Sequence, residues 1–586
     1  VNPMKDRLKG PIANRELLIG ISTGVLLASS MRVFVAGAYS SVEKTFFYNV
    51  MFPSVLGVVL FIIASAVVGK LNRRIGAAIV AAYALVSLLT DATEYTHLIA
   101  ALAIPVALAL LSELDIKYVT MGLVADLGLR VLAVGGEPLD FPHTRIILSL
   151  VVLFGAYALW KDEGKLPKPG FGLYAFAALL ELGLMYPNAV LRYSGINSYY
   201  LPTFVGYSFI IALALLGGPY LARKPKIAPV LLILGTATLF VKPLSLIGLP
   251  LALTSAVALV ESAKTIRKGE LGAIYLFLVV TLALGAYIGR DIGLAFMEDK
   301  LEALIVVASI VYAVVTYGKN APISTPNRKE VVSVLAGLAL VSVIVLALFN
   351  TGPSYAESKK DVLIWSYNIH QGFGPYRGTF NGYELVKLLR EHEPDIIASQ
   401  EVVGGMIANG YQDVPLMLSA YLGYAYEYKP AVEGTYGIAI FSHWRMNTEG
   451  ELNLKSVGQA RPAQKVMIEE LGITLVNVHM GLSEEERAMQ AEELLSFAES
   501  EPAAHVILGD TNAEPDEKAI QIITQEYKDA FEERPPYTFN WGDIDIENID
   551  YILLRRGWPA KVKDYGCLCE VEVSDHRPVW ALIELP

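Results

Sequence analysis

Long apolar stretches separated by short polar loops occupy residues 17 to 350. About thirteen of them approach the roughly 17 to 25 residues that a helix needs to cross the hydrocarbon layer of a bilayer. Their approximate centres are Val25, Leu60, Tyr83, Val106, Leu127, Val152, Leu179, Ile211, Gly235, Leu253, Val280, Ser309 and Ser342. The pattern predicts a polytopic α-helical membrane bundle over residues 1–350. Lys242 and Pro243 predict a tight turn between two helices, with a kink in one re-entrant element as the alternative.

The pattern changes after residue 350. A short polar linker, residues 351–360, leads into apolar runs of strand length that alternate with amphipathic stretches. Residues 361–368, 396–401, 473–480 and 505–510 are predicted strands, and residues 379–393 are a predicted helix that ends before Pro394. Ser483 and Glu486 form an S-x-x-E capping box, which predicts a helix to about Glu499. These units predict an α/β domain over residues 361–586.

Composition supports this division of the chain. The 586 residues are 54% hydrophobic and 18% charged, with a mean hydropathy of +0.45. A single soluble globule, with about 45 to 50% apolar residues, is therefore excluded. Residues 351–586 hold 19 Lys and Arg against 38 Asp and Glu. Because nucleic-acid binders usually present a basic surface, this acidity disfavours a nucleic-acid partner.

Positive charge falls in alternate loops of the apolar region. The basic segments are the N-terminus and residues 70–74, 161–168, 223–226, 264–268 and 319–329. Since Lys and Arg near helix ends are retained on the cytoplasmic side, the helix at 330–350 should exit on the opposite face. The α/β domain is therefore predicted to be extracytosolic in an integral multi-pass protein of the cell membrane. Residues 17–38 could alternatively form a signal peptide, which would leave the predicted side unchanged.

The two cysteines, Cys567 and Cys569, stand two residues apart. On an extended segment this spacing directs the side chains to opposite faces. The sequence therefore predicts no stabilising disulfide, and two small buried apolar residues instead.

Six polar clusters follow the apolar runs of the α/β domain in a fixed order. They are Asn368 in YNIHQG, Glu401 in IIASQE, His479 in VNVHM, Asp510 and Asn512 in ILGDTN, Asp550 in NIDYILL, and Asp575 with His576 in SDHRP. The set resembles the endonuclease/exonuclease/phosphatase superfamily of metal-dependent phosphoesterases. The resemblance implies a four-layer α/β sandwich.

Such chemistry needs a divalent cation and an activated water. Mg²⁺ prefers oxygen ligands, and Mn²⁺ is an alternative. Glu401 is the first expected ligand. The resemblance implies that Asn368 assists at the metal site and that Asp575 lies near it.

Proton transfer should depend on His576 as the general base, with Asp550 as its carboxylate partner. The resemblance implies that Asp510 and Asn512 orient the nucleophilic water. It also implies that His479 donates to the transition-state oxyanion or the leaving group.

Two further residues, His370 and Arg461, are weaker candidates for contact with substrate phosphate. An ordinary surface histidine and surface arginine are the alternatives. Three other histidines, His392, His443 and His505, have no catalytic context and are expected to be structural.

Four ionisable residues lie within or beside predicted spans: Arg32, Asp126, Arg130 and Glu181. The spacing of Asp126 and Arg130 predicts an intrahelical ion pair. The alternative is a polar cavity that admits a lipid headgroup or a solute.

The whole arrangement, a polytopic bundle ahead of a phosphoesterase domain, resembles the eukaryotic family that remodels the lipid of glycosylphosphatidylinositol anchors. The leading hypothesis is a metal-dependent phosphodiesterase that acts on a membrane lipid or a lipid-linked headgroup, including inositol types. One alternative is an anchored extracytosolic nuclease or nucleotide phosphatase. Another is a lipid or solute transporter with an appended phosphoesterase-like domain. The sequence identifies no protein partner.

Overall fold

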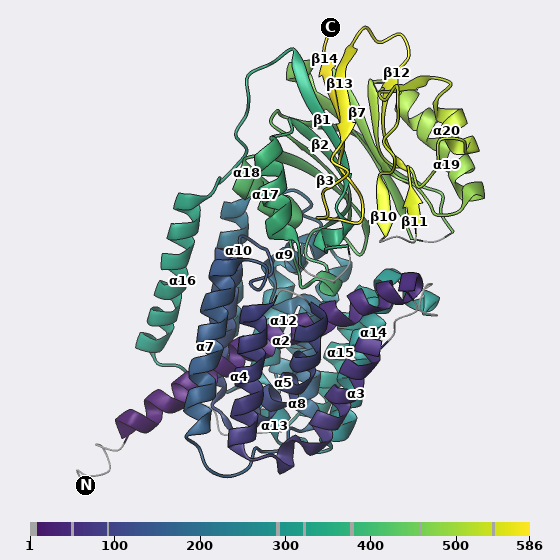
Figure 1. Ribbon diagram of the computed structural model, residues 1–586. Helices are drawn as coiled ribbons and strands as arrows, with labels where there is room; N and C mark the ends of the chain where they lie inside the picture. Colours follow the sequence, from purple (N-terminus) through teal and green to yellow (C-terminus); the bar gives the residue numbers. More distant parts are fainter. Residues whose placement is uncertain are drawn as a thin grey trace, which may run out of the picture. The chain divides into compact units, whose positions relative to one another are not determined.

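The computed structural model describes residues 9–48, 52–90, 93–288, 294–319, 324–375, 380–457, 459–541 and 545–586 (Figure 1). The chain forms two compact units. The first comprises Val1–Gly195, Thr203–Val345 and Ile407–Tyr411, and the second Ile196–Pro202, Leu346–Met406 and Gln412–Pro586. We call them the helical unit and the α/β unit.

Helices make up the helical unit. Their bounds are α2 (Lys9–Tyr48), α3 (Phe52–Val67), α4 (Arg73–Leu89), α5 (Thr93–Glu113), α6 (Ile116–Leu132), α7 (Pro142–Trp160), α8 (Phe171–Leu179), α9 (Pro187–Tyr193), α10 (Leu201–Leu221), α11 (Ala228–Ala237), α12 (Ser245–Ala258), α13 (Val260–Lys264), α14 (Gly269–Ile288), α15 (Leu301–Thr316) and α16 (Arg328–Leu348), whose last three residues lie in the α/β unit. The predicted turn at Lys242 and Pro243 is confirmed, since both residues lie between the single turn Thr238–Phe240 and α12.

Six helices in the described residues are long and apolar enough to cross a membrane, or up to seven if one bent pair is a single span. The six segments are Arg15–Ser40, Thr96–Glu113, Pro142–Trp160, Leu201–Leu221, Gly269–Ile288 and Arg328–Leu348. The predicted thirteen spans are therefore not confirmed. Several apolar stretches form shorter helices instead, such as α11 and α12, which the turn at Lys242 and Pro243 separates.

Four ionisable residues of the helical unit, Arg32, Asp126, Arg130 and Glu137, form a buried charged cluster. Arg32 of α2 donates to both carboxylate oxygens of Asp126, at 2.7 and 2.9 Å, and its Nε donates to Glu137 Oε2 at 2.8 Å. The carboxylate closest to Arg130 is Glu137, at 3.6 Å. The predicted pair of Asp126 with Arg130 was wrong, because α2 packs against α6 and brings Arg32 to Asp126.

Two six-stranded sheets organise the α/β unit. Their strand orders are β13-β14-β1-β2-β4-β3 and β5-β6-β7-β8-β12-β9, and β10 and β11 form a separate pair. The bounds are β1 (Asp361–Asn368), β2 (Ile396–Val403), β3 (Ala425–Val432), β4 (Tyr436–Ser442), β5 (Asn447–Leu454), β6 (Arg461–Ile468), β7 (Ile473–His479), β8 (Val506–Asp510), β9 (Tyr527–Asp529), β10 (Phe539–Trp541), β11 (Asp545–Glu547), β12 (Asp550–Arg555), β13 (Lys561–Cys567) and β14 (Val579–Glu584). β1 runs parallel to β2, and β7 runs parallel to β8.

One buried core joins the two sheets. It takes Ile364 and Ile396 from the first sheet and Leu475, Leu508 and Ile552 from the second. The other face of the second sheet is covered by α19 (Glu484–Glu499) and α20 (Lys518–Ile523) (Figure 1). On the first sheet, α18 (Val414–Leu422) contacts β2 and β3, and α17 (Gly382–His392) packs against α18. The unit is thus a mixed α/β domain.

Local signals placed several of these elements correctly. The predicted helix cap is confirmed, because the Ser483 hydroxyl accepts from the Glu486 N–H at 3.3 Å at the start of α19. The prediction for the cysteines was wrong. Cys567 and Cys569 form a disulfide with Cα atoms 5.2 Å apart. The strand β13 ends at Cys567, so the alternation of an extended chain does not continue to Cys569.

Candidate active site

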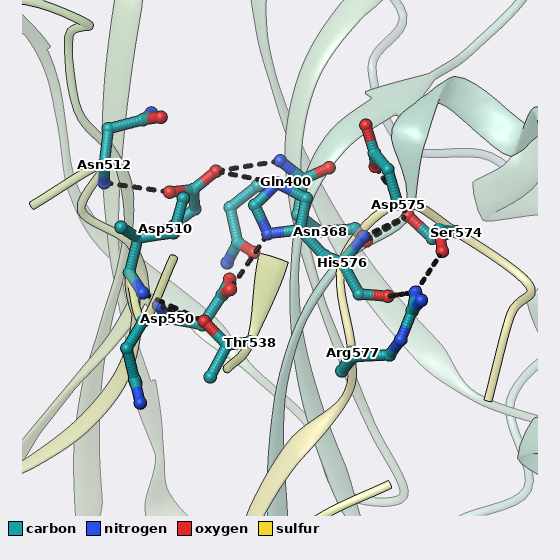
Figure 2. A network of polar contacts seen from close by, with 12 residues as sticks. Asn368, Gln400, Asp510, Asn512, Thr538, Asp550, Ser574, Asp575, His576 and Arg577 are labelled. Carbon is teal, nitrogen blue, oxygen red and sulfur yellow. Dashed lines mark hydrogen bonds and ion pairs between the residues drawn. The ribbon is translucent and has the colours of Figure 1, made fainter. Parts of the chain in front are cut away.

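The polar residues that follow the strands converge at one edge of the two sheets. In the second sheet, Asp510 at the end of β8 pairs with His479 of β7 on one side and with Asp550 of β12 on the other. These three side chains therefore stand in one row across adjacent strands. In the first sheet, Asn368 ends β1, and its amide nitrogen donates to Asp510 Oδ2 at 2.9 Å (Figure 2). This hydrogen bond joins the two sheets at the site.

A histidine and an aspartate form a buried pair at this edge. His576 Nδ1 lies 2.9 Å from Asp550 Oδ2, and His576 Nε2 lies 3.5 Å from Asp510 Oδ2. Thr538 fixes the start of β12, because its hydroxyl accepts from the Asp550 N–H at 3.0 Å. The geometry leaves Nε2 as the nitrogen that faces the site, as a general base requires.

Electrostatics favour the protonated form of this imidazole. Burial lowers the pKa of His576, but the charges of Asp550 and Asp510 outweigh it and raise the pKa to about 10. Burial also raises the pKa of Asp510 to about 7, against the opposing charge of His576. A cation beside these carboxylates would offset their charge and release the His576 proton more readily.

A bulge directs Glu401 away from the regular course of β2. The register with β4 shifts between Ser399 and Val402, and Glu401 has a φ of 52°. Such left-handed backbone is uncommon for a non-glycine residue and is concentrated at functional sites. Asn368 Nδ2 donates to Glu401 Oε1 at 3.3 Å, and Gln371 Nε2 donates to Oε2 at 3.1 Å. Both carboxylate oxygens are thereby oriented.

Arg461 and His479 contact each other directly. Arg461 Nη1 lies 2.8 Å from His479 Nε2. Because a guanidinium has only donors, Nε2 must be the acceptor and His479 must be neutral. Burial, then the Arg461 charge, lowers the pKa of His479 well below its ordinary value. His479 Nε2 also lies 3.5 Å from Asp510 Oδ2, and the donor role predicted for His479 stays a prediction.

Both weaker candidates are buried rather than on the surface. Arg461 is 7% exposed and His370 is 6% exposed. His370 Nε2 lies 3.7 Å from Asp575 Oδ2, and the Ser574 hydroxyl lies 3.1 Å from Asp575 Oδ1. Asp575 therefore contacts His370 and Ser574, and its predicted place near the metal stays a prediction.

Asn512 shapes the loop after β8. Its backbone N–H donates to Asp510 Oδ1 at 2.9 Å, and its side-chain amide donates to the Met480 carbonyl at 3.0 Å. It also has a left-handed φ of 50°. These contacts orient Asp510, while the predicted contact of Asn512 with water stays a prediction.

Residues 366–576 match the sequence model of the Endonuclease/Exonuclease/phosphatase family. This region is an endonuclease/exonuclease/phosphatase domain. No curated protein sequence matches the chain.

Several solved structures resemble this domain. One is an endonuclease/exonuclease/phosphatase from Bacteroides vulgatus, at 23% identity over 39% of this chain and 100% of that chain, with a TM-score of 0.33. Another is the human Nocturnin catalytic domain with bound sulfate anion, at 19% identity over 39% and 97% of the two chains, with a TM-score of 0.31. A third is D. rerio TDP2 complexed with single strand DNA product, at 14% identity over 38% and 99%, with a TM-score of 0.32.

Endonuclease/exonuclease/phosphatase domains typically require a divalent metal, and the side chains of this domain fit one. Glu401 and Asp510 each accept from the Asn368 amide nitrogen, so two carboxylates approach one point. Ligand atoms of Asp510, Asp550 and His576 also lie within 4.8 Å of one another. Since His576 Nδ1 and Asp550 contact each other, we assign these two to the base and the carboxylates of Glu401 and Asp510 to the cation. Asn368 orients both carboxylates, because its Nδ2 donates to each of them while its Oδ1 accepts from the His370 N–H. Hard oxygen donors of this kind suit Mg²⁺ or Mn²⁺.

Sequence reasoning missed three supporting residues of the endonuclease/exonuclease/phosphatase domain. Gln371 contacts Glu401, and it could have been found from its place in the NIHQG cluster. Ser574 donates to the Asn368 carbonyl at 2.9 Å and stands next to Asp575 in the SDH cluster. Thr538, which holds Asp550, lies in a segment with no recognisable motif, so only the structure identifies it.

Proposed function

We propose that this protein is a membrane-embedded, metal-dependent phosphodiesterase that cleaves a phosphodiester of a membrane lipid or lipid-linked headgroup on the extracytosolic side. The observation that carries the proposal is the presence, in one chain, of a phosphoesterase site and six helices of membrane-spanning length. A site tethered to the plane of its substrate meets that substrate at high effective concentration.

Three further observations support parts of this proposal. The excess of acidic residues in 351–586 disfavours a polynucleotide substrate. The disulfide of Cys567 and Cys569 favours an oxidising, extracytosolic environment. The distribution of basic loops agrees with that side of the membrane. The architecture also resembles that of the family that remodels glycosylphosphatidylinositol anchors, which favours an inositol-type headgroup.

The site residues suit an in-line displacement at phosphorus. His576 Nε2 would take a proton from the attacking water while Asp550 stabilises the imidazolium. Asp510 would orient that water, and Arg461 would donate to the non-bridging oxygens. A bound divalent cation would supply charge neutralisation at the phosphoryl group. The new P–O bond forms as the ester P–O bond breaks, and the leaving alkoxide takes up a proton.

The test uses the full-length protein in detergent with Mg²⁺. Inositol-, glycerol- and ethanolamine-headgroup phospholipids and single-stranded DNA are supplied separately, and products are followed by mass spectrometry. We expect headgroup release that requires the metal and falls about 10²- to 10⁴-fold in His576→Ala. His392→Ala is the matched control, since in the described part of the chain His392 Nδ1 bonds to the Leu388 carbonyl of its own helix and the imidazole ring lies against the ring of Trp365.

Two other outcomes would favour one of the alternative functions instead. Cleavage of DNA and of no phospholipid would contradict the hypothesis of a lipid substrate and would favour the anchored nuclease. Absence of turnover on every substrate, with the protein folded and the metal bound, would favour a transporter with a phosphoesterase-like domain.

A further inference from the structure

The helix that begins with α8 is broken inside the helical unit. α8 runs into a π-helical turn, Leu180–Leu184, in which Gly183 has a φ of 95°. α9 then begins at Pro187, and the two parts are bent by 65°. Breaks of this kind release backbone carbonyls from helical hydrogen bonds and often accompany ion sites in membrane proteins.

Glu181 stands at this break without a direct ion pair among the described residues, although Arg32 and Arg130 lie near it. Arg32 pairs with Asp126 and Glu137, and Arg130 lies 3.6 Å from Glu137, so two arginines balance two carboxylates. Glu181 is a third carboxylate and is 1% exposed. Its Oε1 has no hydrogen-bond partner among the described residues. An isolated buried carboxylate is costly, so it requires a proton or another cation.

A side-chain oxygen on the other side of the break, Asn188 Oδ1, also lacks a donor or a cation to bond to among the described residues. Asn188 of α9 is fully buried, and its Oδ1 also lacks a hydrogen-bond partner in the described part of the chain. Tyr411 ties the two sides together, because its hydroxyl donates to the Glu181 carbonyl and its own carbonyl accepts from the Asn188 amide. Both sides of the break thus present acceptor oxygens.

We propose that the break in α8 and α9 binds an exchangeable monovalent cation, Na⁺ or H⁺, with Glu181 as its charged ligand and Asn188 Oδ1 as a neutral one. The atoms that lack partners on Glu181 and Asn188 are acceptors and so favour a cation; of the two nearby guanidinium groups Arg32 is already paired, while Arg130 Nε also lacks a partner among the described residues. The other charged or titratable groups near Glu181 are Arg32, Arg130, Glu137, Tyr186 and Tyr411. This site is separate from the proposed phosphodiesterase chemistry.

The test measures thermal unfolding of the full-length protein in NaCl and in N-methylglucamine chloride at equal ionic strength, from mildly acidic to mildly alkaline pH. We expect Na⁺ to raise the Tm of the unsubstituted protein by roughly 2 °C or more. The rise should disappear in Glu181→Gln and weaken at acidic pH, where protons compete for the carboxylate. Glu302→Gln, which removes an acid paired with Lys242 at 3.3 Å, is the matched control.

Infrared spectroscopy of the same proteins separates the two cations. A carboxylic-acid band that is lost on addition of Na⁺, and is absent from Glu181→Gln, identifies a Na⁺ site. A band that responds to pH but not to Na⁺ identifies a proton site. The proposal is overturned if Glu181 stays protonated throughout with no effect of Na⁺, or if Glu181→Gln responds like the unsubstituted protein. Asn188→Ala provides the second variant if Glu181→Gln does not fold, and it should weaken the Na⁺ effect.

Discussion

The helical unit and the phosphoesterase domain both bury clusters of ionisable side chains, but they balance charge differently. In the helical unit, Arg32 lies between Asp126 and Glu137, so nearly every charge has a protein partner. In the phosphoesterase domain, Asp550 and Asp510 lie 2.9 and 3.5 Å from His576, Glu401 shares the Asn368 amide with Asp510, and Arg461 is bonded to His479. A buried cluster in which the protein supplies a positive charge for each carboxylate maintains structure. A cluster with more negative than positive charge is suited to bind a cation.

Removing the central arginine of the balanced cluster should have the largest effect. Arg32→Met leaves Asp126 buried without its partner and Glu137 with Arg130 alone, and breaking a buried ion pair in this way typically costs about 3 to 5 kcal/mol. Asp510→Asn removes one charge from the unbalanced cluster and should not destabilise the metal-free protein. Thermal unfolding of both variants with a chelator present makes the comparison. Equal losses of stability in the two variants would contradict the proposed difference between the two clusters.

The metal site can be weakened without touching an expected ligand. Gln371→Ala removes the donor that orients Glu401 Oε2. We expect the Mg²⁺ affinity to fall by about 10- to 100-fold, as for other residues that orient ligands. Isothermal titration calorimetry with Mg²⁺ measures this change in affinity. The control is Gln521→Ala on α20, which should leave the affinity unchanged, because among the described residues the side-chain amide of Gln521 bonds to the Asp516 carbonyl alone.

Stability of the metal-free protein should fall as pH rises. The pKa of His576 is raised in the folded protein to about 10 from 6.5, so its pairing stabilises fully below about 6.5 and is lost toward 10. The pKa of Asp510 is raised to about 7, so its ionisation costs stability between about 4 and 7. Both shifts act in one direction, whereas the lowered pKa of His479 acts in the opposite direction below about 6.5. Unfolding measured from about pH 6.5 to 10 should therefore show the decline, and Asp550→Asn should flatten it.

The disulfide gives the smallest expected effect. Replacing both Cys567 and Cys569 by Ser should cost about 1 to 2 kcal/mol, because the bond closes a very short loop. Thermal unfolding with and without a reductant measures this loss. Mass spectrometry of the alkylated native protein tests the bond itself, and two free thiols in protein from the intact membrane would argue against an oxidising compartment.

The sequence alone predicted the α/β fold of the C-terminal region and most of its site. Strand-length apolar runs ending in polar clusters placed Asn368, Asp510 and Asp550 at strand ends, because strand periodicity is local. The Ser483 cap was predictable for the same reason. Hydropathy also separated the apolar region, although helix breaks made the number of spans unpredictable.

Tertiary structure decided the pairings between distant residues. Nothing local shows that Arg32 reaches Asp126, that Arg461 donates to His479, or that Thr538 holds Asp550. The assignment of Ile407–Tyr411 to the helical unit is equally non-local. The pattern of the chain determines which side chains are buried and at which strand ends they lie. Packing determines which of them meet, because a hydrogen bond or an ion pair depends on distances that sequence separation does not set.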